Sequence, residues 1–283
     1  MGLRRILSTC ALCALLCFVP VMVQAQEDSQ KLVAQMVNNE LNAGKHASYW
    51  MFQETLQKGS KSEVDQVIEM PECWLRWPLD VNGNPPSPAQ QQKARASLDR
   101  LVNDADARRQ NRAAINQDSR KSEALLKMLP DAFLYTNHGQ QHGDIQLEFR
   151  PNPAFHPPTR EAKVFHSMQG TLTIDAKELR LVGISGKLMS DVTFGGGLLG
   201  RLHKGGTFQV EQKEVAPGDW ELAQLDVHIT GKALLFKTIS EQQRQKDTDF
   251  RAAPAGLSLA RAASLIEQGE SASASVSDLR RVR

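Results

Sequence analysis

Several groups of residues have the types and the spacing that binding or catalytic chemistry needs. The run Gly195-Gly196-Gly197-Leu198-Leu199-Gly200 satisfies the pattern G-x-G-x-x-G of dinucleotide sites. In such a site the third glycine opens a helix, and the N-terminus of that helix binds the pyrophosphate. Here residues 201–206 lead directly into an expected strand at 207–212, and Gly200 is not followed by the lysine and hydroxyl residue of a P-loop. The context therefore argues against a nucleotide site and favours a turn between strands.

The same run has a second interpretation, as a loop that contacts a membrane or a protein partner. Leucines lie between its glycines, and cationic residues follow them directly. Apolar side chains of such a loop can enter the lipid interface while the cations contact phosphate headgroups. The candidate residues of this membrane or partner loop are Leu198, Leu199, Arg201, Leu202 and Lys204.

The remaining reactive residue types form no catalytic or metal-binding pattern. His138 and His142 are four residues apart, but they lie among glycines in an expected turn, where we interpret them as part of an exposed polar loop rather than as metal ligands beside Asp144. Cys73 has tryptophans beside it and is interpreted as a small buried hydrophobe. The nucleophile pattern G-x-S-x-G does not occur. We therefore predict no catalytic residue, metal or cofactor, and a protein that is not an enzyme.

The first 25 residues have the three parts of a secretory signal. Arg4 and Arg5 precede a largely apolar run, and a small-residue site ends at Ala25, so we expect cleavage after Ala25; an uncleaved anchor is the alternative. Cleavage would leave 258 of the 283 residues, and Cys73 would remain out of four cysteines. The net charge of +2 would fall to zero with the loss of the two arginines. A neutral chain has no global basic excess, so we exclude nucleic acid as the main partner.

Periodicity predicts helices at both ends of the mature chain and in one insertion. Apolar residues recur at helical spacing over 29–43 and again near 258–267. Ser87, Pro88 and Gln90 have the arrangement of a capping box and open a helical insertion at 87–130, whose second helix is expected at 119–128 and ends before Pro130. Residues 269–283 are expected to be a disordered tail.

Strands account for the rest of the expected structure. Two are predicted at 49–56 and 63–77, and residues 133–239 alternate with a period of two between short turns, with one turn at Gly231-Lys232 before Leu234 and Phe236. Local turns leave no room for crossover helices, so the strands form an antiparallel meander. The expected fold class is α+β: a curved antiparallel sheet, or half-barrel, with an N-terminal helix, an inserted helical hairpin and a C-terminal helix, in a single domain over 26–268.

Part of the chain, over about residues 130–250, resembles a group of exported bacterial proteins with no known activity. The resemblance rests on the segments at 148–153, 155–161, 170–175, 191–201, 204–208 and 231–238. More remotely, the layout is similar to the outer-membrane lipoprotein carrier and receptor (LolA/LolB-like) superfamily. That similarity implies an incomplete antiparallel barrel whose apolar concave face, plugged by helices, binds acyl chains without catalysis.

We therefore expect an exported periplasmic or extracellular protein that binds an acyl-chain lipid or a lipoprotein. An apolar cavity between the sheet and the helices would hold the chain, with the insertion as a lid. Candidate lining residues are Trp74, Trp77, Phe208 and Leu225. The alternative is a cell-envelope scaffold or sensor that binds a protein partner; a hydrolase ranks third.

Overall fold

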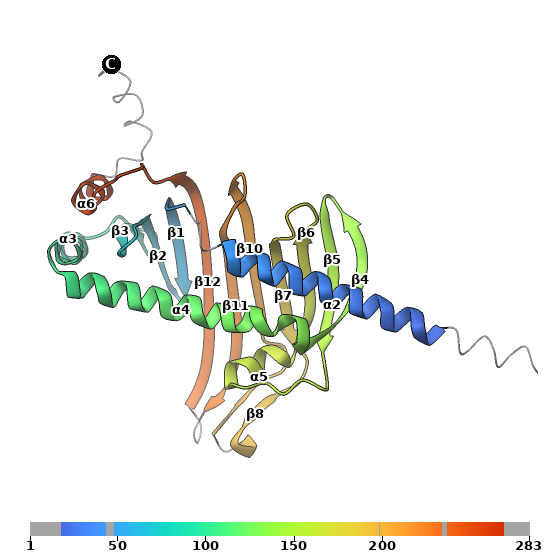
Figure 1. Ribbon diagram of the computed structural model, residues 1–283. Helices are drawn as coiled ribbons and strands as arrows, with labels where there is room; N and C mark the ends of the chain where they lie inside the picture. The colour runs from blue at the N-terminus through green and yellow to red at the C-terminus, as the bar shows by residue number, and fades with distance from the viewer. Residues whose placement is uncertain (1–17, 44–47, 198, 234–236, 269–283) are drawn as a thin grey trace, which may run out of the picture.

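The fold is built on one large antiparallel sheet that does not close (Figure 1). A computed structural model describes residues 18–43, 48–197, 199–233 and 237–268. Ten strands follow the order β3-β2-β1-β12-β11-β10-β7-β6-β5-β4, and β8 and β9 complete the twelve by pairing with each other and with β11. The α+β class with a large antiparallel sheet is thereby confirmed.

The strands differ greatly in length. The strands before the helical insertion are β1 (Trp50–Lys58), β2 (Lys61–Glu69) and β3 (Trp74–Val81). Those after it are β4 (Phe133–Gln141), β5 (Asp144–Pro151), β6 (Met168–Asp175), β7 (Leu181–Leu188), β8 (Val192–Phe194), β9 (Gly200–Leu202), β10 (Thr207–Ala216), β11 (Asp219–Ala233) and β12 (Lys237–Ala252). The two longest, β11 and β12, form the middle of the sheet and join the first three strands to the later meander.

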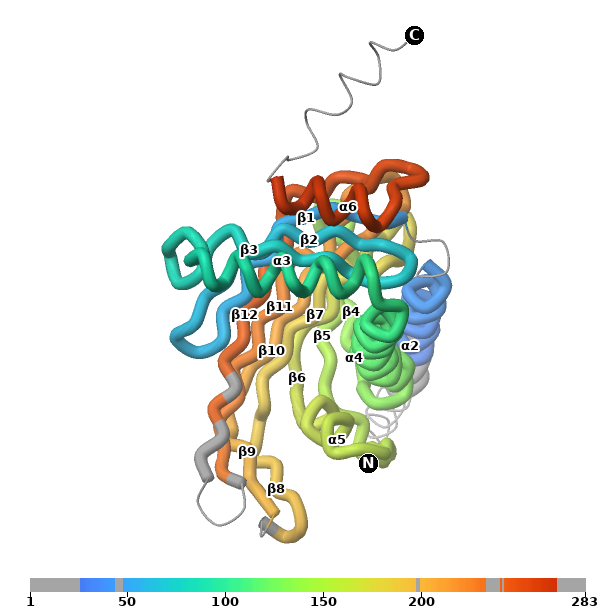
Figure 2. The backbone as a smooth tube through the Cα atoms, turned by 90° about the vertical axis from the view of Figure 1, so that its left-hand side faces the viewer, coloured from blue at the N-terminus to red at the C-terminus, as the bar shows by residue number. Residues whose placement is uncertain are grey.

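The helices cover different parts of the sheet. The long helices α2 (Phe18–Ala43) and α4 (Ala105–Ala132) lie together across one face, whereas α3 (Pro88–Asn103) and α6 (Leu259–Glu267) lie beside β1 to β3 (Figures 1 and 2). The short helix α5 (Arg160–His166) and the β8–β9 hairpin lie at the opposite end of the molecule from α6 (Figure 2). None of the helices in the described ranges is long and apolar enough to cross a membrane.

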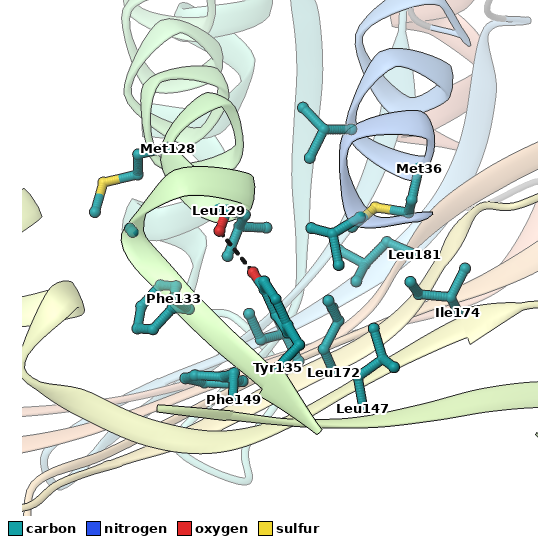
Figure 3. Packing of buried hydrophobic residues seen from close by; sticks show 14 of the residues in the cluster. Met36, Met128, Leu129, Phe133, Tyr135, Leu147, Phe149, Leu172, Ile174 and Leu181 are labelled. Carbon is teal, nitrogen blue, oxygen red and sulfur yellow. Dashed lines mark hydrogen bonds between the residues drawn. The ribbon is translucent and has the colours of Figure 1, made fainter. Parts of the chain in front are cut away.

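The larger core lies between α2, α4 and strands β4 to β7. Met36 of α2, Leu129 of α4 and Phe133 and Phe149 of the sheet are at most 1 % exposed (Figure 3). The hydroxyl of Tyr135 donates a hydrogen bond of 2.6 Å to the carbonyl oxygen of Leu129, which satisfies the polar end of a buried ring (Figure 3). This core fixes the C-terminal half of α4 onto β4.

A second core lies on the other face of β1 to β3. Met51, Ile68 and Leu75 of the three strands pack there with Leu98 of α3 and with α6. Neighbouring residues of a strand point to opposite faces, so Phe52 of β1 faces the side that carries α2 and α4. The first three strands are thus covered on both sides, which explains why their side chains include so many buried apolar residues.

The predicted helices are confirmed at their capped ends and wrong in the insertion. Ser87 and Gln90 form the capping box, and Ser258 caps α6. Helix α2 covers all of 29–43 but begins at Phe18, so the expected start near residue 29 is wrong. The two inserted helices meet at Asp104, whose side chain caps α4, rather than near 119. Pro130 does not end α4, which continues to Ala132.

Three strand predictions are also wrong. The stretch 63–77 is two strands, because Met70 to Cys73 form a tight turn in which the Met70 N–H donates to the Cys73 carbonyl at 3.0 Å. Gly231 does not end a strand but lies inside β11. The sequence alternation also missed β12 beyond residue 239, because the strand is almost entirely polar. Residues 1–17 of the expected leader, Leu198, Leu234 to Phe236 and the expected tail at 269–283 lie outside the described residues.

Candidate functional site

The four residues predicted to line one cavity do not come together. Trp74 and Trp77 are three residues apart in β3, so their side chains point to opposite faces of the sheet. Trp77 is buried in the second core, where the guanidinium carbon of Arg95 lies 5.9 Å from its ring centroid. Trp74 packs edge-on against Phe52, with 6.2 Å between ring centroids. A single cavity lined by both tryptophans is therefore wrong.

Phe208 and Leu225 do lie on one face, in adjacent strands. Phe208 of β10 is opposite Val227 of β11, and Val210 is opposite Leu225, so all four side chains share the face that carries α2 and α4. Phe208 packs against the edge of the larger core, with its ring centroid 5.3 Å from that of Phe165. Leu225 and Val227 are only half-buried. This part of the sheet face is apolar and partly open.

Helix α4 stands clear of the sheet near this apolar face. Every residue from Asn116 to Ser122 is exposed, and these seven residues make about two helical turns. A helix that packed on the sheet would bury one side of each turn. The helix therefore spans like a strap between the second core, where Ala107 is buried, and the larger core, where Leu129 is buried; in Figure 1 it crosses in front of β12 and β11.

A small apolar cluster links the open face to the β8–β9 hairpin. Its buried members are Met168, Leu188 and Val192. The half-buried side chains around them come from α5, the hairpin, β10 and β11: Val164, Phe194, Leu202, Phe208 and Ile229. Phe208 and Ile229 belong to the open sheet face, and Phe194 and Leu202 belong to the hairpin. An uninterrupted set of apolar side chains therefore runs from the hairpin to the half-buried residues of β11.

The glycine run forms the bend of this hairpin rather than a nucleotide loop. Gly195 and Gly196 have φ angles of +56° and +64°, in the left-handed region that favours glycine. A side chain at Gly195 would also meet the Leu199 side chain at 2.6 Å. Gly200 then opens β9, as expected for a turn between strands, and no helix follows it.

The hairpin exposes large apolar side chains. Among the described residues the exposed large apolar side chains are Tyr49, Met189 and Leu199, at 40 %, 44 % and 46 %. Met189 lies just before β8 and Leu199 just before β9. Of the predicted loop residues, Arg201 and Lys204 are exposed and Leu202 is half-buried, while Leu198 lies outside the described residues.

A pocket of about 280 Å³ opens between α5 and the hairpin. Its lining combines cations with apolar side chains and one carboxylate: Arg160, Glu161, Val164, Phe194, Leu199, Gly200, Arg201 and Leu202. The sequence interpretation missed Arg160 and Val164, because it did not predict α5, and it did not connect Phe194 of β8 with this helix. The signal was present in Thr159, which caps α5 by accepting a hydrogen bond from the Ala162 N–H at 3.1 Å.

A separate group of buried carboxylates lies between β1, β2, β3 and β12. The Arg76 guanidinium forms a two-pronged ion pair with Glu54 and lies 3.7 Å from Asp65. Burial raises the pKa of Asp247 to about 7, and burial also raises the pKa of Glu69 to about 7. Burial, followed by the negative charge of Glu69, raises the pKa of Glu221 to about 8. None of these carboxylates lines the pocket at the hairpin or the larger groove on the sheet.

The face of the sheet opposite α2 and α4 carries a polar groove of about 660 Å³ across strands β1, β12, β11, β10, β7 and β6. Its side chains are mainly amides and hydroxyls, including Gln57, Gln169, Ser185, Gln209 and Gln242. Asp226 and Arg244 pair across it at 2.8 Å. An antiparallel sheet with one solvated face has this polar composition without any ligand.

The residues weighed as metal ligands or nucleophile form no metal-binding or catalytic group among the described residues. His138 is 3.4 Å from Glu148, and His142 lies in the β4–β5 turn with a φ of +55°. No group of three or more His, Cys, Asp or Glu side chains within the described ranges is arranged to hold a metal ion. Cys73 is fully buried, and burial raises the pKa of its thiol, which disfavours the reactive thiolate.

Comparisons of the chain with protein-family models, with curated protein sequences and with solved structures found no match.

Proposed function

We propose that this protein is an exported binder of acyl-chain lipids or lipoproteins, whose curved sheet acts as a half-barrel. One observation carries the proposal: apolar side chains continue from the exposed β8–β9 hairpin, through Phe208 and Ile229, to the half-buried Leu225 and Val227. An acyl chain bound along this path would leave lipid or water and would contact apolar protein side chains along its whole length.

The energetics suit an acyl chain. Each methylene group that leaves water contributes about 0.8 kcal/mol. Residues 116–122 of α4 are exposed and are not packed on the sheet, so a movement of this segment would admit a ligand to the sheet face. The buried ends of α4 would hold the strap in place during such a movement.

A paired substitution on β11 tests the proposal. Val227 and His228 are adjacent, so their side chains lie on opposite faces of the same strand. Val227→Gln places an amide in the proposed path, whereas His228→Gln places the same amide on the face opposite α2 and α4. In a displacement assay with the purified full chain, the affinity for a fluorescent fatty acid should fall several-fold in Val227→Gln and stay unchanged in His228→Gln.

Two outcomes would overturn the proposal. One is wild-type protein that neither binds the fluorescent fatty acid nor carries any acyl ligand in native mass spectrometry and lipid extracts. The other is equal loss of binding in both variants, which would place the ligand elsewhere.

The alternative proposal is a non-catalytic envelope scaffold that binds a protein partner through α4. The observation in its favour is the same exposed stretch at 116–122, which offers a charged helical surface, including Arg120 and Lys121. Arg120→Glu combined with Lys121→Glu should then abolish partner cross-linking and leave fatty-acid displacement intact. Unchanged cross-linking in this double variant would exclude α4 as the contact surface.

A further inference from the structure

We infer that the end of the molecule formed by α5 and the β8–β9 hairpin is a docking surface for an anionic lipid bilayer. We call this part of the structure the hairpin end; it comprises residues 160–166, 187–197, 199–206 and 231–233, and it lies opposite α6 (Figure 2). The inference goes beyond the proposed acyl binding, because it assigns the surface by which the protein reaches a membrane.

The hairpin end carries exposed apolar side chains. Of the three exposed large apolar side chains among the described residues, Met189 and Leu199 lie here. Leu199 is held in the bend of the hairpin, because its N–H donates a hydrogen bond of 3.2 Å to the Phe194 carbonyl. A large apolar side chain that is held in water gains free energy when it enters the lipid interface.

The hairpin end also has an excess of positive charge. It contains six lysines and arginines and two carboxylates, whereas the whole chain has a net charge of only +2. The remainder of the chain is therefore net negative. All six cationic side chains are exposed: Arg160, Lys163, Lys187, Arg201, Lys204 and Lys232. Clusters of exposed lysine and arginine are attracted to anionic lipid headgroups.

Strand pairing places two of these cations side by side. Leu202 packs in the apolar cluster with Phe208, so its neighbour Arg201 points to the opposite face of the sheet, away from α5. Arg201 is directly opposite Lys232 in the antiparallel pair of β9 and β11. Like charges directly opposite each other destabilise a sheet. A negatively charged bilayer surface would relieve this repulsion.

The nearest carboxylate neutralises these cations only in part. Asp191 lies 3.8 Å from Arg201, but it also lies 3.9 Å from His203 and accepts a hydrogen bond of 2.8 Å from the Lys204 N–H. Among the described residues, neither Lys204 nor Lys232 forms an ion pair. The positive charge of the hairpin end therefore remains available to an anionic surface.

The coincidence of apolar and cationic side chains favours a bilayer over a soluble polyanion. Segments that lie in a membrane interface combine apolar side chains that enter it with cations that stay at the headgroups. Leu199 precedes Arg201 by two residues, so one hairpin supplies both. Phe194 and Leu202 behind them belong to the apolar cluster that reaches Phe208. The proposed acyl path would therefore open toward the docked membrane.

Vesicle co-sedimentation of the full chain tests the cationic part of the surface. Vesicles of phosphatidylcholine are compared with vesicles that also contain phosphatidylglycerol, at one salt concentration. Wild-type protein should prefer the anionic vesicles, and Arg201→Gln combined with Lys232→Gln should reduce that preference about 30-fold, at ~1 kcal/mol per cation near an anionic surface. The matched control is Arg120→Gln combined with Lys246→Gln, which removes the same charge from exposed positions outside the hairpin end. It should retain the preference.

A second pair of variants tests the apolar part of the surface. Met189→Gln combined with Leu199→Gln leaves every charge in place and should weaken binding to the anionic vesicles at least five-fold. Tyr49→Gln is the control, because Tyr49 is also exposed but lies near α6, where its carbonyl accepts a hydrogen bond of 2.8 Å from the Ala253 N–H. It should bind these vesicles like wild-type protein.

Four results would overturn the docking surface. They are equal affinity of wild-type protein for the two kinds of vesicle, an equal loss in the Arg120 and Lys246 control, and an equal loss in Tyr49→Gln. The fourth is a loss in the Arg201 and Lys232 variant without any loss in the Met189 and Leu199 variant, which would assign the surface to a soluble polyanion. Fatty-acid displacement on the same variants separates the two proposals: if it persists while vesicle binding is missing, only the docking surface fails.

Discussion

Glu54 of β1 and Asp247 of β12 are directly opposite each other in adjacent strands, and each residue is at most 7 % exposed. The Gln245 side-chain amide donates to both, at 3.1 Å to Glu54 and 3.0 Å to Asp247. Arg76 forms an ion pair with Glu54, so the two buried carboxylates share one guanidinium group and one amide as their polar partners. This arrangement leaves Asp247 without a full counter-charge.

The first prediction follows from the pKa of Asp247, which burial raises to about 7. In the unfolded chain an aspartate titrates near ~4, so the folded protein binds this proton more tightly. Stability is therefore greatest below about pH 4 for this group and falls as the pH rises toward about 7. Asp247→Asn should raise the free energy of unfolding at pH 8 by on the order of 2 kcal/mol and have little effect at pH 4.

Denaturant unfolding at the two pH values measures the difference. Asp249→Asn is the matched control, because Asp249 is exposed and its φ of +57° lies in a region that asparagine tolerates. It should change stability little at either pH. An Asp247→Asn variant that is destabilised equally at pH 4 and pH 8 would contradict the prediction.

The second prediction concerns the attachment of α2 to the sheet. The guanidinium of Arg180 lies 2.8 Å from Glu40, both side chains are less than 10 % exposed, and the Leu181 N–H donates to the same carboxylate at 2.8 Å. Glu40→Gln should destabilise the protein by about 3 kcal/mol, because it leaves a buried arginine without its counter-ion. Lys31→Gln, which breaks the exposed pair with Asp28, should cost less than about 1 kcal/mol in the same thermal unfolding experiment. Equal losses of stability in Glu40→Gln and Lys31→Gln would contradict the assignment of Glu40 as the buried counter-ion of Arg180.

Local signals in the sequence were sufficient for the capped helices and for much of the meander. Ser87 with Gln90 predicted where α3 begins, since a cap is recognised within a few residues, and apolar spacing predicted α6 near 258–267. The strand β12 gave no apolar alternation, because its inward residues Gln243, Gln245 and Asp247 are polar. Its partners in β1 and β11, distant in the sequence, hold it in the centre of the sheet.

The candidate site was predictable only in part for a related reason. Leu199, Arg201, Leu202 and Lys204 are contiguous and were recognised together. Arg160 reaches the pocket through α5, and Lys232 is placed opposite Arg201 by the pairing of β9 with β11. Such long-range register leaves no local pattern. The wrong grouping of Trp74 with Trp77 has a local cause, because residues three apart in one strand point to opposite faces.

The third prediction tests the capping box that begins α3. The Ser87 side chain accepts a hydrogen bond from the Gln90 N–H, and the Gln90 side chain accepts one of 2.7 Å from the Ser87 N–H. Ser87→Ala should lower the free energy of unfolding by about 1 kcal/mol. Ser119→Ala, in the exposed middle of α4, should be neutral or slightly stabilising, because alanine has the higher helix propensity there. Urea unfolding of both variants measures the contrast, and a loss in Ser119→Ala as large as that in Ser87→Ala would contradict it.

The fourth prediction concerns Gly231, at which β9 approaches β11 most closely. A Cβ atom at this position would overlap the carbonyl oxygen of Arg201, which belongs to the backbone and has no rotamer by which to move away. Gly231→Ala should therefore separate β9 from β11 and increase amide hydrogen exchange at 200–202. Gly183→Ala is the control in the same sheet, since its Cβ would lie 3.3 Å from the nearest atom, the Val210 carbonyl oxygen, which needs only a small adjustment. Because the cores around Phe133 and Leu75 lie elsewhere in the sheet, Gly231→Ala should keep most of the global stability. Unchanged exchange at 200–202 in Gly231→Ala would show that the hairpin does not depend on this close approach.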